Sequence, residues 1–80
     1  MNISYDSRYN IAYLRLAKKT KNVNSIKIGE EIIVDIGKDG TLYGLEFLNA
    51  NKQLFSEKSG AEFSVLNEAT GKHIEIPLPV

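Results

Sequence analysis

The chain has 80 residues, with ten Lys and Arg balanced by ten Asp and Glu, so its formal net charge at neutral pH is zero. This length fits one small domain, and zero net charge disfavours a protein built to grip nucleic-acid backbones. The absence of cysteine excludes disulfides and thiol chemistry, and the single histidine excludes a two-histidine metal site. The sequence shows no apolar run of about 18 residues and no cationic leader before an apolar core, so we expect a cytoplasmic protein with no membrane partner.

The first half of the chain predicts three short strands. Residues 2–6 alternate polar and apolar side chains and predict a strand, which is followed by a turn over residues 6–10. Residues 11–16 predict a second strand, with Ala12, Leu14 and Leu16 on one face. A polar loop is expected over residues 18–25, and residues 25–29 predict a short third strand.

Residues 31–49 predict a hairpin around a two-residue turn, Asp39-Gly40, because Asp-Gly between alternating apolar runs favours this geometry. A two-residue loop places all the apolar partners on one face, whereas a three-residue loop splits them between both faces. The expected pairs are Ile36 with Tyr43, Val34 with Leu45 and Ile32 with Phe47. The other face is mixed, and carries Ile33, Asp35, Leu42, Gly44, Glu46 and Leu48.

The last third of the chain predicts a helix and an edge strand. Residues 51–55 fit a turn or a short helix, and residues 56–69 have helical spacing of apolar side chains. Residues 73–80 alternate again, but Pro77 and Pro79 cannot donate to a strand ladder, which predicts an edge strand or an extended tail.

The expected fold is a single α+β domain over residues 1–80. It is an antiparallel meander of about four strands, with one short helix on its apolar face and a C-terminal edge strand. The expected core contains the apolar side chains that alternate onto one face, together with one from the predicted helix: Tyr5, Leu14, Ile32, Val34, Ile36, Tyr43, Leu45, Phe47 and Leu66.

Several short motifs lie beside these strands and turns: Tyr5-Asp6, residues 12–16, Val34-Asp35, Asp39-Gly40, residues 44–50 and the closing residues 76–79. Together they resemble the uncharacterised bacterial family called domain of unknown function 2283. That family usually has an aspartate at the position of Asn10 and an acidic turn at Gly37-Lys38. The resemblance implies a small cytoplasmic domain from a bacterium or a phage, and it implies no activity, because none is established for the family.

The acidic residues of the hairpin offer two chemical alternatives. Asp35, Asp39, Gly40 and Glu46 match four of five marked positions of a calcium-binding loop, but Gly37 stands where a ligand belongs. The flanking strands also replace the helices that such a loop needs. Asp35 and Glu46 share a face near-diagonally, which makes a hydrolytic carboxylate pair or a metal site the third-ranked hypothesis.

The lysines near the predicted polar loop are the basis of a second hypothesis. A weak nucleic-acid binder would use a local basic surface with nearby aromatic side chains such as Tyr9 and Tyr13. The zero net charge makes nucleic acid a disfavoured partner. The contact residues in this hypothesis are Lys18, Lys19, Lys21 and Lys27.

The first-ranked hypothesis is a non-catalytic interaction module without a cofactor, so no residue is assigned to catalysis, cofactor binding or metal binding. It acts as a homodimer, or as a small partner or antitoxin-like inhibitor of another small protein. The expected interaction surface combines the apolar residues of the second hairpin face with those of the C-terminal edge: Ile33, Leu42, Leu48, Ile74 and Ile76.

Overall fold

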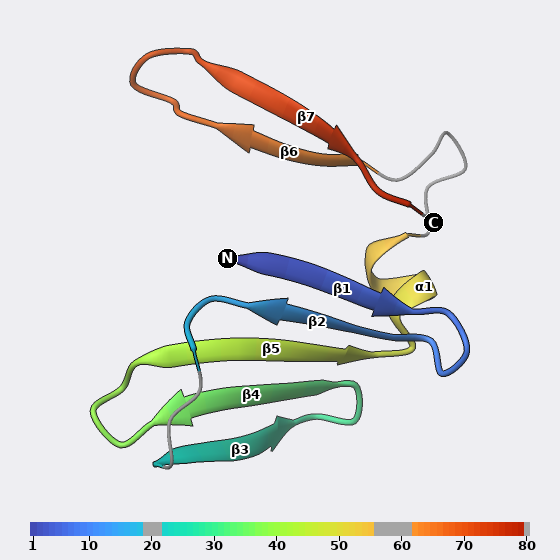
Figure 1. Ribbon diagram of the computed structural model, residues 1–80, viewed down its shortest axis with the longest axis vertical. Helices are drawn as coiled ribbons and strands as arrows, with labels where there is room; N and C mark the ends of the chain where they lie inside the picture. The colour runs from blue at the N-terminus through green and yellow to red at the C-terminus, as the bar shows by residue number, and fades with distance from the viewer. Residues whose placement is uncertain (19–21, 56–61, 80) are drawn as a thin grey trace.

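The computed structural model describes residues 1–18, 22–55 and 62–79 of the chain. It contains a five-stranded sheet, a short helix and a separate two-stranded sheet (Figure 1). The strands of the larger sheet are β1 (Asn2–Asp6), β2 (Ile11–Arg15), β3 (Val23–Ile28), β4 (Ile32–Gly37) and β5 (Leu42–Leu48). The α+β class and the antiparallel arrangement are confirmed.

The strand order of the larger sheet is β1-β2-β5-β4-β3, and every neighbouring pair is antiparallel. Strands that follow each other in the chain form three hairpins: β1 with β2, β3 with β4, and β4 with β5. The fourth contact joins β2 to β5, which are distant in sequence, and pairs Leu14 with Leu45. The sheet therefore has five strands instead of about four, and β5 lies at its centre.

The predicted two-residue loop between β4 and β5 is wrong. Gly37 N–H donates to the Thr41 carbonyl at 2.8 Å, so Lys38, Asp39 and Gly40 form a three-residue loop. A bulge then shifts the register, because Asp35 pairs with Gly44 whereas Ile36 pairs with Leu42. The bulge takes up the extra loop residue and restores the expected pairs of Val34 with Leu45 and Ile32 with Phe47.

The expected pair of Ile36 with Tyr43 is lost at this bulge. Tyr43 instead packs against Gly37, where an added β-carbon would lie 2.9 Å from Tyr43 Cε2. The hairpin thus keeps its apolar partners aligned by two compensating irregularities, and not by the tight turn that the sequence suggested.

The helix lies earlier in the chain than the main prediction placed it. Of the two alternatives left open for residues 51–55, a turn or a short helix, the structure shows the short helix α1 (Ala50–Leu54). The helix predicted over residues 56–69 is wrong where the structure describes it, because β6 (Glu62–Leu66) is a strand paired with β7 (His73–Pro77). The rest of that prediction, residues 56–61, lies outside the described residues.

The strand β6 forms because side chains that also fit a helical stripe alternate apolar and polar along residues 62–65. Gly71, with φ of 74°, then turns the chain so that β7 returns beside it. The Asn67 N–H donates to the Lys72 carbonyl at 2.8 Å and closes this turn.

The predicted core is wrong in its degree of burial. Among the described residues the only fully buried apolar side chains are two alanines, Ala12 and Ala50, and no large side chain is fully buried. Leu66 has 57 % of its surface exposed, because it lies across from His73 on the polar side of β6. The remaining predicted core residues are only half-buried: Tyr5, Leu14, Ile32, Val34, Ile36, Tyr43, Leu45 and Phe47.

Candidate interaction surface

One face of the five-stranded sheet is apolar across every strand. Residues directly opposite each other in a sheet point to the same side, so the register defines two cross-strand rows. One row is Ile3, Leu14, Leu45, Val34 and Ile26, and the other is Tyr5, Ala12, Phe47, Ile32 and Ile28. We call these ten residues the open face.

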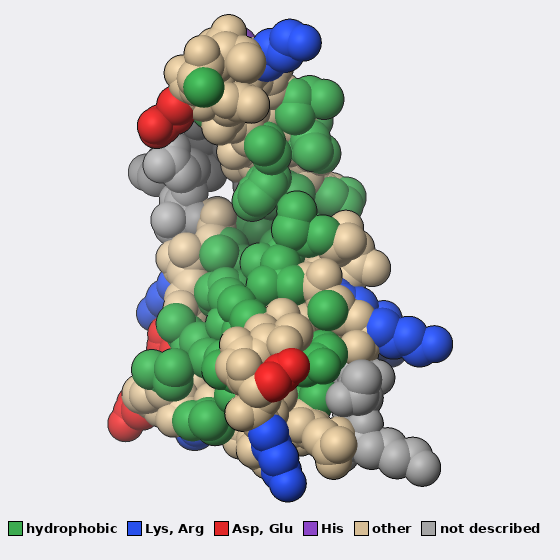
Figure 2. Space-filling model, turned by 90° about the vertical axis from the view of Figure 1, so that its left-hand side faces the viewer, with side chains coloured by type: hydrophobic (Ala, Val, Ile, Leu, Met, Phe, Trp, Pro, Cys, Tyr) green, Lys and Arg blue, Asp and Glu red, His purple; other side chains and the backbone are tan. Residues whose placement is uncertain are grey.

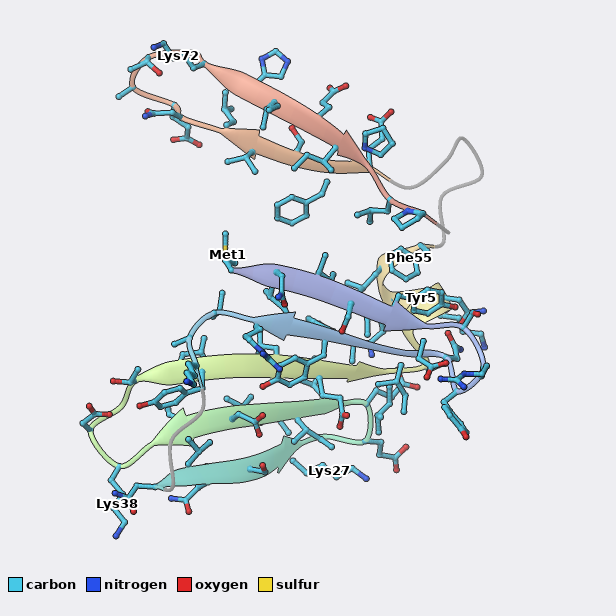
Figure 3. All side chains as sticks on the ribbon, in the orientation of Figure 1. Met1, Tyr5, Lys27, Lys38, Phe55 and Lys72 are labelled. Carbon is cyan, nitrogen blue, oxygen red and sulfur yellow. The ribbon has the colours of Figure 1, made fainter. Side chains whose placement is uncertain are left out.

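The outer strands leave the open face most accessible. Ile26 and Ile28 of β3 are 51 % and 57 % exposed, and Ile3 of β1 is 37 % exposed. At one end of the open face Phe55 partly covers Tyr5, and the two rings meet edge-to-face with their centroids 4.8 Å apart (Figure 3). A sheet with one apolar face normally buries that face against another layer, and most of the open face has no such layer among the described residues.

The smaller sheet also has an apolar side. Phe63 pairs with Ile76 and Val65 pairs with Ile74, so these four side chains project to one side of the β6–β7 hairpin. They are between 43 % and 60 % exposed. We call them the hairpin apolar side. Figure 2 shows hydrophobic side chains in a nearly continuous band along the molecule, from the larger sheet up to the hairpin.

The size of the molecule agrees with this exposure. A compact chain of 8.9 kDa exposes about 4,800 Å² of surface. This chain exposes 6321 Å², an excess of about 1,500 Å². Its Cα radius of gyration is 14.3 Å, against about 12 Å for a compact domain of the same length. The single chain is therefore less compact than a typical domain of the same mass.

The opposite face of the larger sheet holds a buried carboxylate. Asp35 is only 4 % exposed, and Tyr13 Oη donates to its Oδ2 at 2.7 Å while Ser25 Oγ donates to its Oδ1 at 2.6 Å. The Tyr13 phenol lies over Gly44, where a β-carbon would overlap the ring. The two hydrogen bonds tie β2 and β3 to Asp35 of β4, and the close approach of Tyr13 to Gly44 brings in β5, so these contacts reinforce the order of four strands.

The two carboxylates proposed as a catalytic or metal pair do share a hollow. Glu46 pairs with Ile33 and is thus diagonal to Asp35, as the sequence predicted. Together with Tyr13, Ser25 and Ile33 they line a hollow of about 260 Å³. Asp39 lies apart in the β4–β5 loop, where its Oδ1 accepts the Thr41 N–H at 3.0 Å. Within the described ranges, no three acidic or histidine side chains are grouped to hold a metal ion.

Sequence reasoning missed a cluster of amides at one end of the sheet. Asn10 Nδ2 donates to Asn51 Oδ1 at 2.7 Å and to Asn49 Oδ1 at 3.2 Å, and Asn10 Oδ1 accepts the Asn51 N–H at 2.9 Å. Gln53 Nε2 donates to the carbonyls of Leu48 and Glu31. The cluster joins the β1–β2 turn and α1 to the end of β5. Three asparagines flanking predicted strand ends were the available signal.

Two exposed aspartates have pKa values below their ordinary range. The pKa of Asp6 is lowered chiefly by the side-chain hydrogen bond from Arg8, whose Nη2 lies 2.8 Å from Asp6 Oδ2. The pKa of Asp39 is lowered chiefly by the hydrogen bond from the Thr41 backbone N–H. Asp6 is the last residue of β1, directly before the β1–β2 turn, and Asp39 lies in the β4–β5 loop, so both contacts stabilise turns.

The structure separates the five residues predicted as an interaction surface. Ile33 and Leu48 are half-buried on the face that carries Asp35. The bulge pairs Leu42 with Ile36. Leu42 therefore does not share a face with Asp35, as the regular register would have required. Ile74 and Ile76 belong to the hairpin apolar side.

Of the four lysines of the nucleic-acid hypothesis, the two that the structure describes lie on different parts of the sheet. Lys18 is exposed beyond the end of β2, and Lys27 is exposed in β3 (Figure 3). Lys19 and Lys21 lie outside the described residues. In the described part of the chain, no helix is both long and apolar enough to cross a membrane.

Comparison with known proteins identifies a family for this chain but no activity. No curated protein matches the chain significantly. No solved structure does so either. The family described as protein of unknown function (DUF2283) matches residues 2–51. This range contains the whole five-stranded sheet and the asparagine cluster, and it stops before the β6–β7 hairpin. The sheet with its open face is thus the part that defines the relationship, and the chain belongs to the DUF2283 family.

Proposed function

We propose that this protein is a non-catalytic interaction module of the cytoplasm, and that it acts as a homodimer closed over the open face. The observation that carries the proposal is the burial pattern, since Ala12 and Ala50 are the only fully buried apolar side chains among the described residues. Both are too small to build a core. An association partner supplies the missing layer.

Elementary energetics support this proposal. A fully buried Leu, Ile or Phe contributes about 1.5–3 kcal/mol relative to an exposed one. Side chains that remain half-exposed supply only part of that gain, and a chain of 80 residues has a thin stability margin. Without cysteine, the chain has no disulfide to make up the difference. Burying the open face against a second chain adds core without adding residues.

The native mass of the protein, measured over a range of concentrations, tests the proposal. We expect twice the chain mass of 8.9 kDa for the unchanged protein. Ile28→Lys places a charge on the open face at a position already 57 % exposed, so it should disrupt association more than folding. Asn22→Lys is the matched control, because it adds the same charge just before β3, outside the open face.

The two variants give a clear decision. Dimer in the control and monomer in Ile28→Lys support the proposal. A chain that stays at 8.9 kDa at every concentration reached contradicts it.

In a second version of this proposal the partner is a different small protein, and this chain acts as an antitoxin-like inhibitor whose open face is covered by that protein. Affinity purification of the tagged chain from its native host separates the two versions. A second copy alone in the purified complex favours the homodimer. A different protein in one-to-one amount, with displacement of the second copy, favours the inhibitor.

A further inference from the structure

We propose that the β6–β7 hairpin packs its apolar side on the open face of a second copy of this chain, so that two copies cover each other's larger sheet. This inference rests on the proposed association and specifies its geometry. The occupant of the open face is then a defined segment, residues 62–77, of the partner chain.

The hairpin itself needs a partner surface. An isolated two-stranded hairpin is at best marginally stable in water. In the described residues, β6 pairs only with β7, and the four residues of the hairpin apolar side are all more than two-fifths exposed. The outer side of the hairpin carries Glu62, Ser64, His73 and Glu75, which suit solvent, together with Leu66 and Pro77. The hairpin is thus more apolar on one side than on the other, and the apolar side lacks a covering layer among the described residues.

The open face is the matching surface. It presents ten side chains in two rows across five strands, without a charged residue among them. The hairpin apolar side likewise contains only Phe, Val and Ile. When two sheets pack face to face, their inner apolar side chains interdigitate in a layer about 10 Å thick. The hairpin apolar side and the open face therefore each have the apolar composition of an inner face in such a packed pair of sheets.

A reciprocal arrangement accounts for the excess surface better than contact between two open faces. Standard interfaces bury about 800 Å² on each partner. The excess of this chain over a compact one is about 1,500 Å², and both the open face and the hairpin contain large apolar side chains that are exposed. Direct contact between two open faces leaves both hairpins uncovered. In a two-fold arrangement, each hairpin covers the partner's sheet and both kinds of surface are buried together.

Disulfide trapping between single-cysteine variants tests this geometry. The natural chain has no cysteine, so every trapped disulfide reports the introduced pair. Val65→Cys on the hairpin apolar side is mixed in turn with Val34→Cys, Leu45→Cys and Ile26→Cys, which sample three strands of the open face. A disulfide forms only where the two β-carbons approach to about 4 Å. Because each chain carries one cysteine, mixed disulfides are necessarily intermolecular.

The matched control is Ser64→Cys, which lies one residue away on the outer side of the same strand. We expect at least one open-face variant to give a mixed dimer with Val65→Cys on a non-reducing denaturing gel. We expect loss of that product when Ser64→Cys replaces Val65→Cys. In addition, Val65→Lys should raise the dimer dissociation constant by about tenfold or more, whereas Ser64→Lys should not change it.

The outcomes separate this inference from the proposed association. A dimer in native mass measurements that traps Val34→Cys with itself, and never with Val65→Cys, places the two open faces together and overturns the hairpin geometry alone. A monomer at all concentrations overturns both proposals. Trapping between hairpin and open face, combined with a weakened Val65→Lys dimer, supports the reciprocal arrangement.

Discussion

At the scale of single residues, two asparagines in the left-handed region fix one end of the sheet. Asn10 has φ of 56° and Asn49 has φ of 54°, and among residues other than glycine asparagine tolerates this region best. The Asn10 carbonyl also accepts the Ala50 N–H at 2.9 Å. Backbone geometry therefore accounts for an asparagine at this position.

Substitution of Asn10 separates its backbone role from its side-chain role. We expect Asn10→Ala to lower the free energy of unfolding by about 2–3 kcal/mol, because it strains the left-handed backbone and removes the side-chain hydrogen bonds. Asn10→Gly should cost about 1 kcal/mol less, since glycine adopts this conformation freely. Urea unfolding measures both changes. Equal losses in the two variants would show that the positive φ costs nothing at this site.

The Asp6–Arg8 pair predicts a local dependence on pH. The hydrogen bond from Arg8 lowers the pKa of Asp6 below its ordinary value of 3.8, so the pair stabilises the fold above that value and loses its effect as pH falls through the folded pKa. Arg8→Ala should therefore raise the pKa of Asp6 toward 3.8. An NMR titration of the Asp6 carboxyl group in the unchanged chain and in Arg8→Ala measures this change in pKa.

Asp39 is the internal control for that titration, because its lowered pKa depends on Thr41 and not on Arg8. Its pKa should stay unchanged in Arg8→Ala. An Asp6 pKa that does not move would mean that the pair is absent in solution, as is found for many exposed ion pairs.

At the scale of elements, the β4–β5 hairpin shows how a loop and a bulge compensate. Gly40 has φ of 86° and its N–H donates to the Gly37 carbonyl at 3.0 Å, which makes a turn followed by a left-handed glycine. This three-residue loop alone would put the apolar residues of β5 on the wrong face. The irregularity between Asp35 and Ile36 restores them. The apolar pattern of both strands selects this combination.

Gly40 gives a sharp test of that loop. An added β-carbon meets no atom within 4 Å, so the whole cost of Gly40→Ala is the positive φ. We expect a loss of about 1 kcal/mol in the free energy of unfolding. Gly40→Asn should recover part of it, and Lys38→Ala, at an exposed position of the same loop, should be neutral. No change in Gly40→Ala would contradict the loop geometry.

At the scale of the whole molecule, the open face and the hairpin apolar side are the dominant features. The larger sheet is held together by its backbone pairing, by the buried Asp35 and by the asparagine cluster, yet within the described part of the chain its apolar face lacks most of a second layer. In the proposed dimer the chain gains its remaining core on association, and its stability is then linked to its concentration.

Thermal unfolding measures that linkage directly. For a dimer of two 80-residue chains with ordinary unfolding enthalpy, each tenfold rise in concentration should raise Tm by about 4 °C. Ile28→Lys should lower Tm and remove the dependence on concentration. A Tm of the unchanged chain that is independent of concentration would contradict association.

The sequence by itself determined the elements whose pattern is local. Alternation over residues 2–6, 11–16 and 32–48 predicted the main strands and two of the three register pairs of the central hairpin, because side chains in a strand alternate with period two. The diagonal placement of Asp35 and Glu46 followed from the same rule.

Only the tertiary structure decided features that depend on distant residues. Residues 62–66 fit both a helix and a strand, and pairing with residues 73–77 selected the strand. The contact between β2 and β5 and the burial of Asp35 beneath Tyr13 likewise join residues far apart in the chain. Periodicity reports which side chains share a face, whereas the burial of that face depends on what packs against it. That is why six of the predicted core residues are found only half-buried on the open face of the sheet: Tyr5, Leu14, Ile32, Val34, Leu45 and Phe47.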